Sequence, residues 1–415
     1  MKRRLLPLLS GFFIYIFLIT NFIYFISSTK NTQFVSPTFF TKAYDTVYSN
    51  DITSKVGTFI TDSNINTEDS ILTFIGEVFD IRNAAFLNGN VEKLYEFYDI
   101  DQTFSAYSLK HEFKRIAYLR DWANERSLTF KNIKSTATIK DLKIKDGIYN
   151  LTLSEEFKFD YFYNNSPNIV NTFGINLIHT LELKDFDNSF IIFKDYYEDY
   201  FKSGLEEYDF NLTEKNIPIK SNKSRTFNFA IDRYPKSNSN YNIKAAVNYA
   251  NKYSGISFAS NEKFNLKYSI YVAGEGNSAN FISQCLSDNI EGGGLSQDKM
   301  WFYKNTNSSG VKATSSWVKP EDLIDYLLDK SNFSIKSSGS IDEILYDTNT
   351  NNKKIALGDL VVFKNGSYIE SIGIVTDFDN NNYPLINSNS INTYKAPFDL
   401  GFNSDNVECY ILSSN

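Results

Sequence analysis

The chain has 415 residues, of which 42% are hydrophobic and 22% charged, and its formal net charge is −7. This length predicts two or three domains, at roughly 100–200 residues each. The acidic balance argues against a nucleic-acid binder, because such proteins usually carry a basic patch. Two cysteines cannot form a four-thiolate zinc site, and the only histidines are His111 and His179. We therefore expect neither a metal site nor a cofactor.

The first residues predict a membrane anchor. Three basic residues, Lys2 to Arg4, precede an uncharged, largely apolar run from Leu5 to Phe25. That run is long enough to cross a bilayer of ~30 Å as a helix. The basic flank lies on its N-terminal side, which leaves the rest of the chain outside the cytoplasm. We predict a signal-anchor transmembrane helix over residues 1–28, with a single pass through the cell membrane and an extracytoplasmic bulk. A cleaved signal peptide is the alternative.

Residues 29–65 are polar and predict a stalk. A first folded domain is predicted over residues 66–202, with a helix that begins at Thr67 and apolar residues at helical spacing as far as Trp122. From about Thr136 the period changes to two, which is typical of strands. Helices followed by antiparallel strands are an α+β pattern. The order resembles the nuclear transport factor two type of module, in which a curved sheet wraps around helices.

A linker is predicted over residues 203–240, because this stretch carries Gly204, Pro218 and Pro235 among many Ser, Asn and Lys residues. Both histidines lie before it, in the first domain. A single histidine on a helix or a strand is usually a packed or surface residue, so we assign a function to neither of them.

The last predicted domain covers residues 241–415. It begins with an amphipathic helix over residues 241–253. Gly274 and Gly276 then permit a tight loop before a second helix, so Ser278 is predicted near a helix N-terminus. The helix dipole and the free N–H groups at such a position favour a thiolate or an oxyanion.

Further motifs follow in a fixed order along this domain. The last of them predict consecutive strands. Helices followed by a meander of strands are the order of a papain-like α+β domain. The motifs are Trp301–Tyr303, Ser315–Val318, Leu323–Leu327, Leu357–Phe363, Ile372–Thr376 and Tyr383–Ile386.

Together these motifs resemble the putative amidase domain family of Gram-positive bacteria, a papain-like relative of the CHAP and NlpC cell-wall hydrolases. The resemblance implies a papain-like fold for the C-terminal domain. In this family it also implies a Cys–His pair that cleaves an amide bond, a place at the cell wall and peptidoglycan as the ligand.

The chemical positions of the family are substituted in this chain. Ser278 stands where the family has its nucleophilic cysteine, and Asn277 where it has an aspartate. Ser371 falls on the general-base histidine, and Asn389 on the second polar residue, in the following strand. Because no histidine follows His179, a Cys–His pair cannot be assembled within this domain. The resemblance therefore implies degenerate catalytic positions. The cleft candidates beside them are Asn277, Asn280, Trp301, Tyr303 and Glu370.

Three functions follow from this pattern. The first is a pseudoenzyme that binds a peptidoglycan stem peptide or an envelope protein through the old cleft. The second is an active cell-wall amidase or peptidase with Ser278 as nucleophile and Glu370, Glu275 or Lys364 as its base. The third is a purely structural module of an envelope or sporulation assembly. Loss of a histidine base favours the first of these over the second.

Two pairs of side chains each allow two interpretations. Cys285 and Cys409 fall at core-like positions and are expected to pack, although an extracytoplasmic location also permits a disulfide between them. Trp301 and Tyr303 are aromatic residues that line a groove for a peptide or a glycan in one interpretation and fill the core in the other.

Overall fold

The computed structural model does not describe every residue of the chain. The predicted anchor over residues 1–28, and the predicted stalk as far as residue 61, lie outside the described part. Within the described part, no helix is both long and apolar enough to cross a membrane. The described residues are 62–227, 230–236, 240–258, 261–271, 277–306, 310–346, 354–402 and 407–414.

The N-terminal region, residues 62–217, consists of helices followed by four long strands. The first helix begins at Asp62, which is earlier than the predicted start at Thr67; helix ends are the least certain part of any sequence-based assignment. Its elements are α3 (Asp62–Asn88), η1 (Glu92–Phe97), α4 (Thr103–Glu125), β1 (Leu128–Lys145), β2 (Ile148–Tyr163), β3 (Asn171–Phe186), β4 (Ser189–Tyr197) and η2 (Gly204–Glu207).

Two tight hairpins set the order of these strands. Asp146 and Gly147 connect β1 to β2 with positive φ angles of 52° and 73°. Asp187 and Asn188 connect β3 to β4 with φ angles of 46° and 61°. Two-residue turns of this kind need positive φ at both positions, which Gly, Asn and Asp tolerate best. The local sequence therefore dictates both antiparallel pairs.

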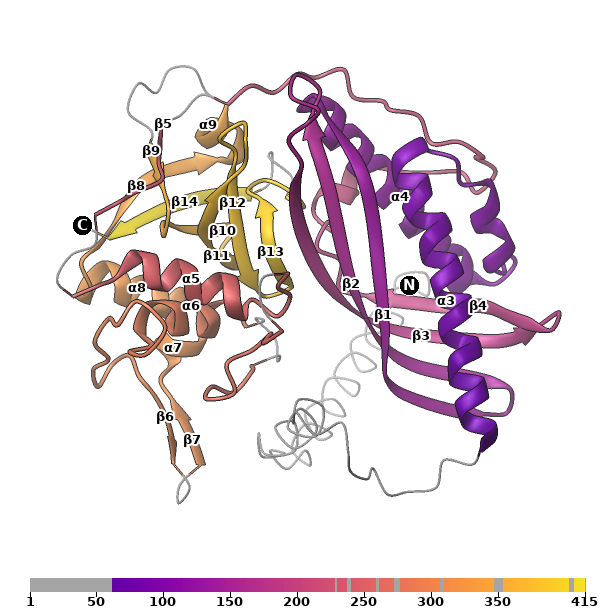
Figure 1. Cartoon of the computed structure of the whole chain (residues 1–415), viewed down its shortest axis with the longest axis horizontal. Helices are drawn as coiled ribbons and strands as arrows, with labels where there is room; N and C mark the ends of the chain where they lie inside the picture. The colour runs from indigo at the N-terminus through magenta and orange to yellow at the C-terminus, as the bar shows by residue number, and fades with distance from the viewer. Residues whose placement is uncertain are drawn as a thin grey trace, which may run out of the picture. The chain divides into compact units, whose positions relative to one another are not determined.

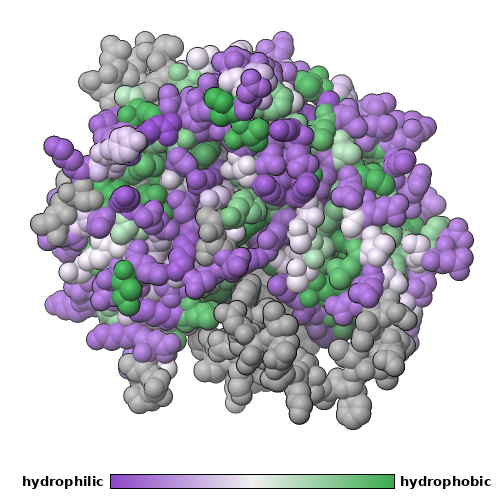
Figure 2. Space-filling view, in the orientation of Figure 1, coloured by the Kyte–Doolittle hydropathy of each residue, from purple (hydrophilic) through white to green (hydrophobic). Residues whose placement is uncertain are grey.

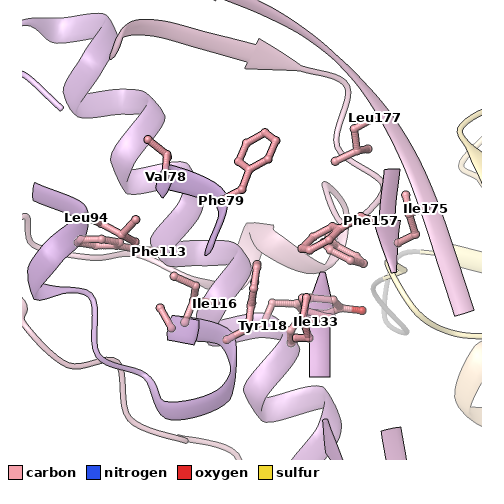
Figure 3. Packing of buried hydrophobic residues seen from close by; sticks show 14 of the residues in the cluster. Val78, Phe79, Leu94, Phe113, Ile116, Tyr118, Ile133, Phe157, Ile175 and Leu177 are labelled. Carbon is pink, nitrogen blue, oxygen red and sulfur yellow. The ribbon is translucent and has the colours of Figure 1, made fainter. Parts of the chain in front are cut away.

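The core of the N-terminal region lies between its helices and its sheet. Figure 3 shows side chains of α3 and α4 packed toward those of the strands. Along β2 the burial alternates, so that every second residue faces this core. Leu205, Phe210 and Ile217, which lie within the predicted linker, are also buried here. The chain thus stays packed on the N-terminal region as far as Ile217.

The C-terminal region, residues 240–414, combines short helices with antiparallel strands. The mixed α and β composition with antiparallel sheets that the sequence predicts is confirmed. Its elements are α5 (Ile243–Tyr253), α6 (Ser278–Ser287), β6 (Tyr303–Thr306), β7 (Gly310–Ala313), α7 (Ser315–Val318), α8 (Pro320–Lys330), β8 (Phe333–Ser340), α9 (Ile341–Leu345), β9 (Lys354–Ala356), β10 (Leu360–Asn365), β11 (Tyr368–Phe378), β12 (Pro384–Asn389), β13 (Asn392–Pro397) and β14 (Val407–Ser414). A short strand before it, β5 (Ala230–Asp232), pairs with β9.

Strand β10 shows how the C-terminal region builds two layers of core. Leu360 and Val362 belong to the cluster that includes residues of α5, α6 and α8. Val361 and Phe363 belong to the cluster on the other face of the sheet. This alternation follows from the period of two in a strand. Figure 1 shows α5 to α8 gathered beside these strands, and Figure 2 shows hydrophilic residues over much of the visible surface.

One sheet runs through both regions (Figure 1). Its order is β1-β2-β3-β13-β12-β11-β10-β14-β8, and β4 pairs with β3 beside this path. Strand β3 shares one edge between two partners, because residues 174–176 pair with β13 and residues 179–186 pair with β4. The strands that carry Ser371 and Asn389 therefore continue the sheet of the N-terminal region.

Candidate functional site

Helix α6 places the first of the predicted site residues. It begins at Ser278, as the glycine-rich loop before it predicts, and every residue of the helix is buried. Phe281 and Leu286 are among its core residues. The helix packs against α5 and α7 and against strands β11 and β12. Helix α6 thus packs against the two strands that hold the other predicted positions.

Asn277 and Asn389 meet across this junction. The Nδ2 of Asn277 donates a hydrogen bond of 2.6 Å to the Oδ1 of Asn389, which is the last residue of β12. The Oδ1 of Asn277 accepts from the backbone N–H of Tyr271 at 2.9 Å and from the Nδ2 of Asn280 at 2.8 Å. Two neutral amides therefore join the start of α6 to the end of β12.

Ser371 lies on β11, next to the strand that carries Asn389. Its hydroxyl forms hydrogen bonds with the hydroxyls of Ser388 at 3.1 Å and Ser390 at 3.2 Å, the residues on either side of Asn389. Ser388 also donates to the carbonyl oxygen of Ile372 at 2.9 Å. Sequence reasoning did not identify Ser388 and Ser390, although both flank a predicted position. The result is a set of three hydrogen-bonded hydroxyl groups beside Asn389.

The Ser278 hydroxyl is buried and makes no hydrogen bond with the described residues. Ser278 is 0% exposed, and its Oγ is without a hydrogen-bond partner there. Glu370 approaches Lys202 of the N-terminal region instead, at 3.7 Å, and its Oε2 has no hydrogen-bond partner in the described part of the chain. Lys364 donates to the hydroxyl of Tyr410 at 3.4 Å, and Glu275 lies outside the described residues. No candidate base therefore contacts Ser278 in the described structure, and a serine without a base is a poor nucleophile.

The aromatic cleft candidates belong to the core. Trp301 is 0% exposed and donates from its Nε1 to the Ser283 hydroxyl at 3.0 Å. Tyr303 is buried, and its hydroxyl accepts from the backbone N–H of Ser269 at 2.9 Å. The structure favours the core interpretation of these two residues, because both are buried against the ring of Trp317.

Asn280 is also a structural residue. Its Oδ1 accepts from the Nε1 of Trp317 at 2.8 Å, and its Nδ2 donates to the Ser269 carbonyl at 2.9 Å. Every polar atom of this side chain is thus satisfied inside the protein. The cysteines are equally inert: Cys285 and Cys409 are free and buried, and burial raises the pKa of both thiols. They pack, and they do not form a disulfide.

The ionisable cluster of the molecule lies elsewhere, in the core of the N-terminal region. Arg82 pairs with Glu155, whose Oε2 lies 3.2 Å from the Nε2 of His179. The Nδ1 of His179 lies 2.9 Å from Asp195. Arg115 donates to Glu112 at 3.0 Å and 3.2 Å. Sequence reasoning missed this network, although charged residues at core positions of α3 and α4 were a visible signal.

Neighbouring carboxylates determine the pKa of His179. Burial by itself would lower its pKa, but the charge of Asp195 and the hydrogen bonds that the ring donates to both carboxylates raise it to about 9. Burial likewise opposes ionisation of Glu155, and Arg82 and His179 together keep the pKa of that carboxyl far below its usual range. The described residues contain no group of His, Cys, Asp and Glu side chains that could hold a metal ion.

The geometry defines an α+β domain in which a buried helix N-terminus faces two strands of an antiparallel sheet through neutral polar groups. Residues 240–412 match the family model described as a putative amidase domain. This match confirms the resemblance that the motifs of the C-terminal region predict. No curated protein and no solved structure matches the chain.

Proposed function

We propose that this protein is anchored in the cell membrane and that its extracytoplasmic amidase domain, built on a papain-like scaffold, binds without cleaving. The ligand is a peptidoglycan stem peptide or a protein of the cell envelope. The membrane location rests on the basic residues and the apolar run at the start of the sequence. The ligand class rests on the amidase family of the C-terminal region.

The observation that carries the loss of catalysis is the isolation of Ser278. Its hydroxyl is buried and has no partner among the described residues. Ser371 and Asn389 supply neither an imidazole nor a carboxylate. A nucleophile needs a base within hydrogen-bond reach, and the base needs a group that orients it. The described arrangement supplies neither.

Two unpaired atoms support the binding role. The Oγ of Ser278 and the Nδ2 of Asn389 are buried without a hydrogen-bond partner in the described part of the chain. A buried polar group without a partner costs about 1–3 kcal/mol. The amide group of a peptide offers one acceptor and one donor, so a bound peptide would satisfy both atoms. Ser278 and Asn389 are buried in the free protein. A ligand therefore reaches them only when the structure around them opens locally.

Two measurements test the proposal separately. For catalysis, the full chain is incubated with muropeptides and the products are analysed by mass spectrometry. We expect no new product. A product that forms with the wild type and is lost in Ser278→Ala would establish the enzyme reading.

For binding, the full chain is sedimented with purified peptidoglycan, and crosslinking in cells is used to capture envelope proteins. We expect capture by the wild type and weakened capture by Asn389→Leu, which removes the unpaired donor. Asn305→Ala is the matched control, because Asn305 is an exposed asparagine on β6 outside the site. Equal capture by both variants would show that the old site does not bind, and would leave the purely structural role.

A further inference from the structure

The sheet of the N-terminal region has a second face, opposite to its helices. Helices α3 and α4 lie on one side of β1, β2 and β3 (Figure 1). Phe157 of β2 points into the core on that side, and so does its cross-strand partner Ser135, which accepts a hydrogen bond from Arg82. Because side chains alternate along a strand, the neighbouring residues Lys158 and Lys134 point to the opposite face.

This opposite face continues to the candidate site. Asn389 pairs with Asn392 on β13, which pairs with Asn176 on β3. Asn176 in turn pairs with Glu156 on β2. Residues directly opposite each other in an antiparallel sheet point to the same face. Glu156 and Asn389 therefore lie on one face, about 14 Å apart across three strand spacings.

Four lysines lie around Glu156, and we call this area the lysine face. Lys134 and Lys158 are directly opposite each other on β1 and β2. Lys263, which follows α5 in the chain, pairs with Glu156. Burial and the charge of Lys140 lower the pKa of Lys263, so these two ammonium groups are also neighbours. Like charges placed opposite each other in a sheet are destabilising, and an anion between them relieves the repulsion.

The carboxylates of this area do not balance its lysines. Glu156, Asp160 and Asp141 each pair with a lysine. The lysine of the last pair is Lys143, which makes five lysines against three carboxylates and leaves an excess of two positive charges. Lys134 has no carboxylate within ion-pair distance in the described part of the chain. The chain as a whole has a net charge of −7, so this local excess is opposite in sign to the rest of the protein and attracts an anionic partner.

The distance between the lysines favours an extended ligand. Lys134 and Lys140 are separated by about 20 Å along β1, at roughly 3.3 Å per residue. A single anionic group cannot contact both of them, whereas a chain of such groups can. Thr136 and Thr138 lie between them and are exposed, so their hydroxyls can donate to the same chain.

The type of cation favours phosphate over carboxylate. Strands β1, β2 and β3 contain lysines and no arginine. Lysine binds phosphate as a point charge with three donors, whereas bidentate recognition of a carboxylate relies on the planar guanidinium of arginine. A chain of phosphate groups therefore suits this surface better than a chain of carboxylates.

We propose that the lysine face binds an extended polymer that carries repeated phosphate groups. The ammonium groups of Lys134, Lys158, Lys140 and Lys263 contact successive phosphates along β1. The polymer is then held on the same face of the sheet as Asn389. This surface does not include Ser278, so the binding is independent of the function proposed for that site.

Fluorescence anisotropy with the full chain tests the proposal, and labelled long-chain polyphosphate is the probe. We expect polyphosphate to bind and inorganic phosphate to compete poorly, because a single phosphate reaches only one end of the surface. The affinity should fall at least about tenfold between about 50 mM and about 200 mM salt, as expected when several ammonium groups contact phosphates. Polyglutamate should bind more weakly than polyphosphate.

Lys134→Gln combined with Lys158→Gln is expected to weaken polyphosphate binding about tenfold and to reduce its salt dependence, because two contacts are lost. Lys304→Gln combined with Lys312→Gln is the matched control. It removes another pair of lysines that are directly opposite each other, on β6 and β7, and it should leave the affinity unchanged.

Two further variants separate this surface from folding and from the candidate site. Lys134→Arg combined with Lys158→Arg keeps both charges and should retain most of the binding, and Ser278→Ala should bind like the wild type. Equal affinity in the two glutamine double variants, or polyglutamate that binds as tightly as polyphosphate, would overturn the proposal. Single-stranded DNA that binds much more tightly than polyphosphate would also overturn it, because the bases would then be recognised.

Discussion

The two regions of this protein bury polar groups in opposite ways. The N-terminal region places ionised side chains in its core, with Arg82, Glu155 and His179 in direct contact. The C-terminal region places amides and hydroxyls at the junction of α6 with the sheet, with Asn277 bound to Asn389. The junction at Asn277 and Asn389 is therefore built from neutral groups, and the buried ionised groups lie in the other region.

This difference distinguishes charged side chains that stabilise the fold from charged side chains that would take part in catalysis. Buried ions are tolerated when each finds a partner, and breaking one pair leaves the other ion uncompensated. Neutral amides and hydroxyls need no partner ion and do not titrate near neutral pH. We therefore expect the N-terminal region to depend strongly on charge and pH, and the candidate site to depend on neither.

The largest effect is expected at Glu155. Glu155→Gln removes the negative charge that faces both Arg82 and His179. The free energy of unfolding should fall by about 3–5 kcal/mol, because two buried positive charges each lose one of their carboxylate partners. Urea denaturation measures this change. Asp141→Asn is the control, because Asp141 pairs with Lys143 on the exposed part of β1, and it should change stability little. Similar losses in both variants would contradict the comparison.

The second test is how the contribution of His179 to the free energy of unfolding changes with pH. Its pKa is about 9 in the folded protein and about 6.5 when unfolded. The folded state thus binds the proton more tightly, so the stabilisation is complete below pH of about 6.5. It is lost as the pH rises through about 9, and amounts to at most roughly 3 kcal/mol.

The measurement compares the free energy of unfolding of the wild type and His179→Gln between these two pH values. The wild type should lose its advantage over the variant as the pH rises. A difference that stays constant across the range would show that His179 does not carry a charge in the folded protein.

A smaller effect is expected at Asn389. Asn389→Ala leaves the buried Nδ2 of Asn277 without its acceptor, so the free energy of unfolding should fall by about 1–3 kcal/mol. The loss should not depend on pH, because no ionised group is involved. Chemical denaturation at two pH values checks both statements. Ser390→Ala, one residue along, should be milder, because it removes a single hydroxyl that is only partly buried.

The smallest effect is expected at Ser278. Ser278→Ala removes a hydroxyl that has no hydrogen-bond partner in the described structure, so stability should stay within about 0.5 kcal/mol of the wild type or increase. Ser283→Ala on the same helix is the matched control. It removes the hydroxyl that joins Trp301 to the Trp317 carbonyl, and thermal unfolding should show a clear loss. A loss at Ser278 as large as that at Ser283 would reveal a hidden partner of Ser278.

Much of the local structure was accessible from sequence. The loop before Ser278 predicted the start of α6, and the motifs around β10 and β11 predicted strands. The predicted amidase resemblance is confirmed by the family match over residues 240–412. The sequence left Trp301 open between a groove and the core, because aromatic residues have the same sequence signal in both, and the structure buries it.

The sequence by itself determined the helix and strand periods, the tight turns and the absence of any histidine after His179. These features depend on neighbours within a few residues, or on composition alone. Only the tertiary structure decided that Asn277 bonds to Asn389, 112 residues away, and that Arg82 pairs with Glu155, 73 residues away. Such contacts depend on the packing of whole helices against the sheet. The same packing left Ser278 buried and without a partner among the described residues, which turned a substituted motif into a specific hypothesis about a site that binds and does not cleave.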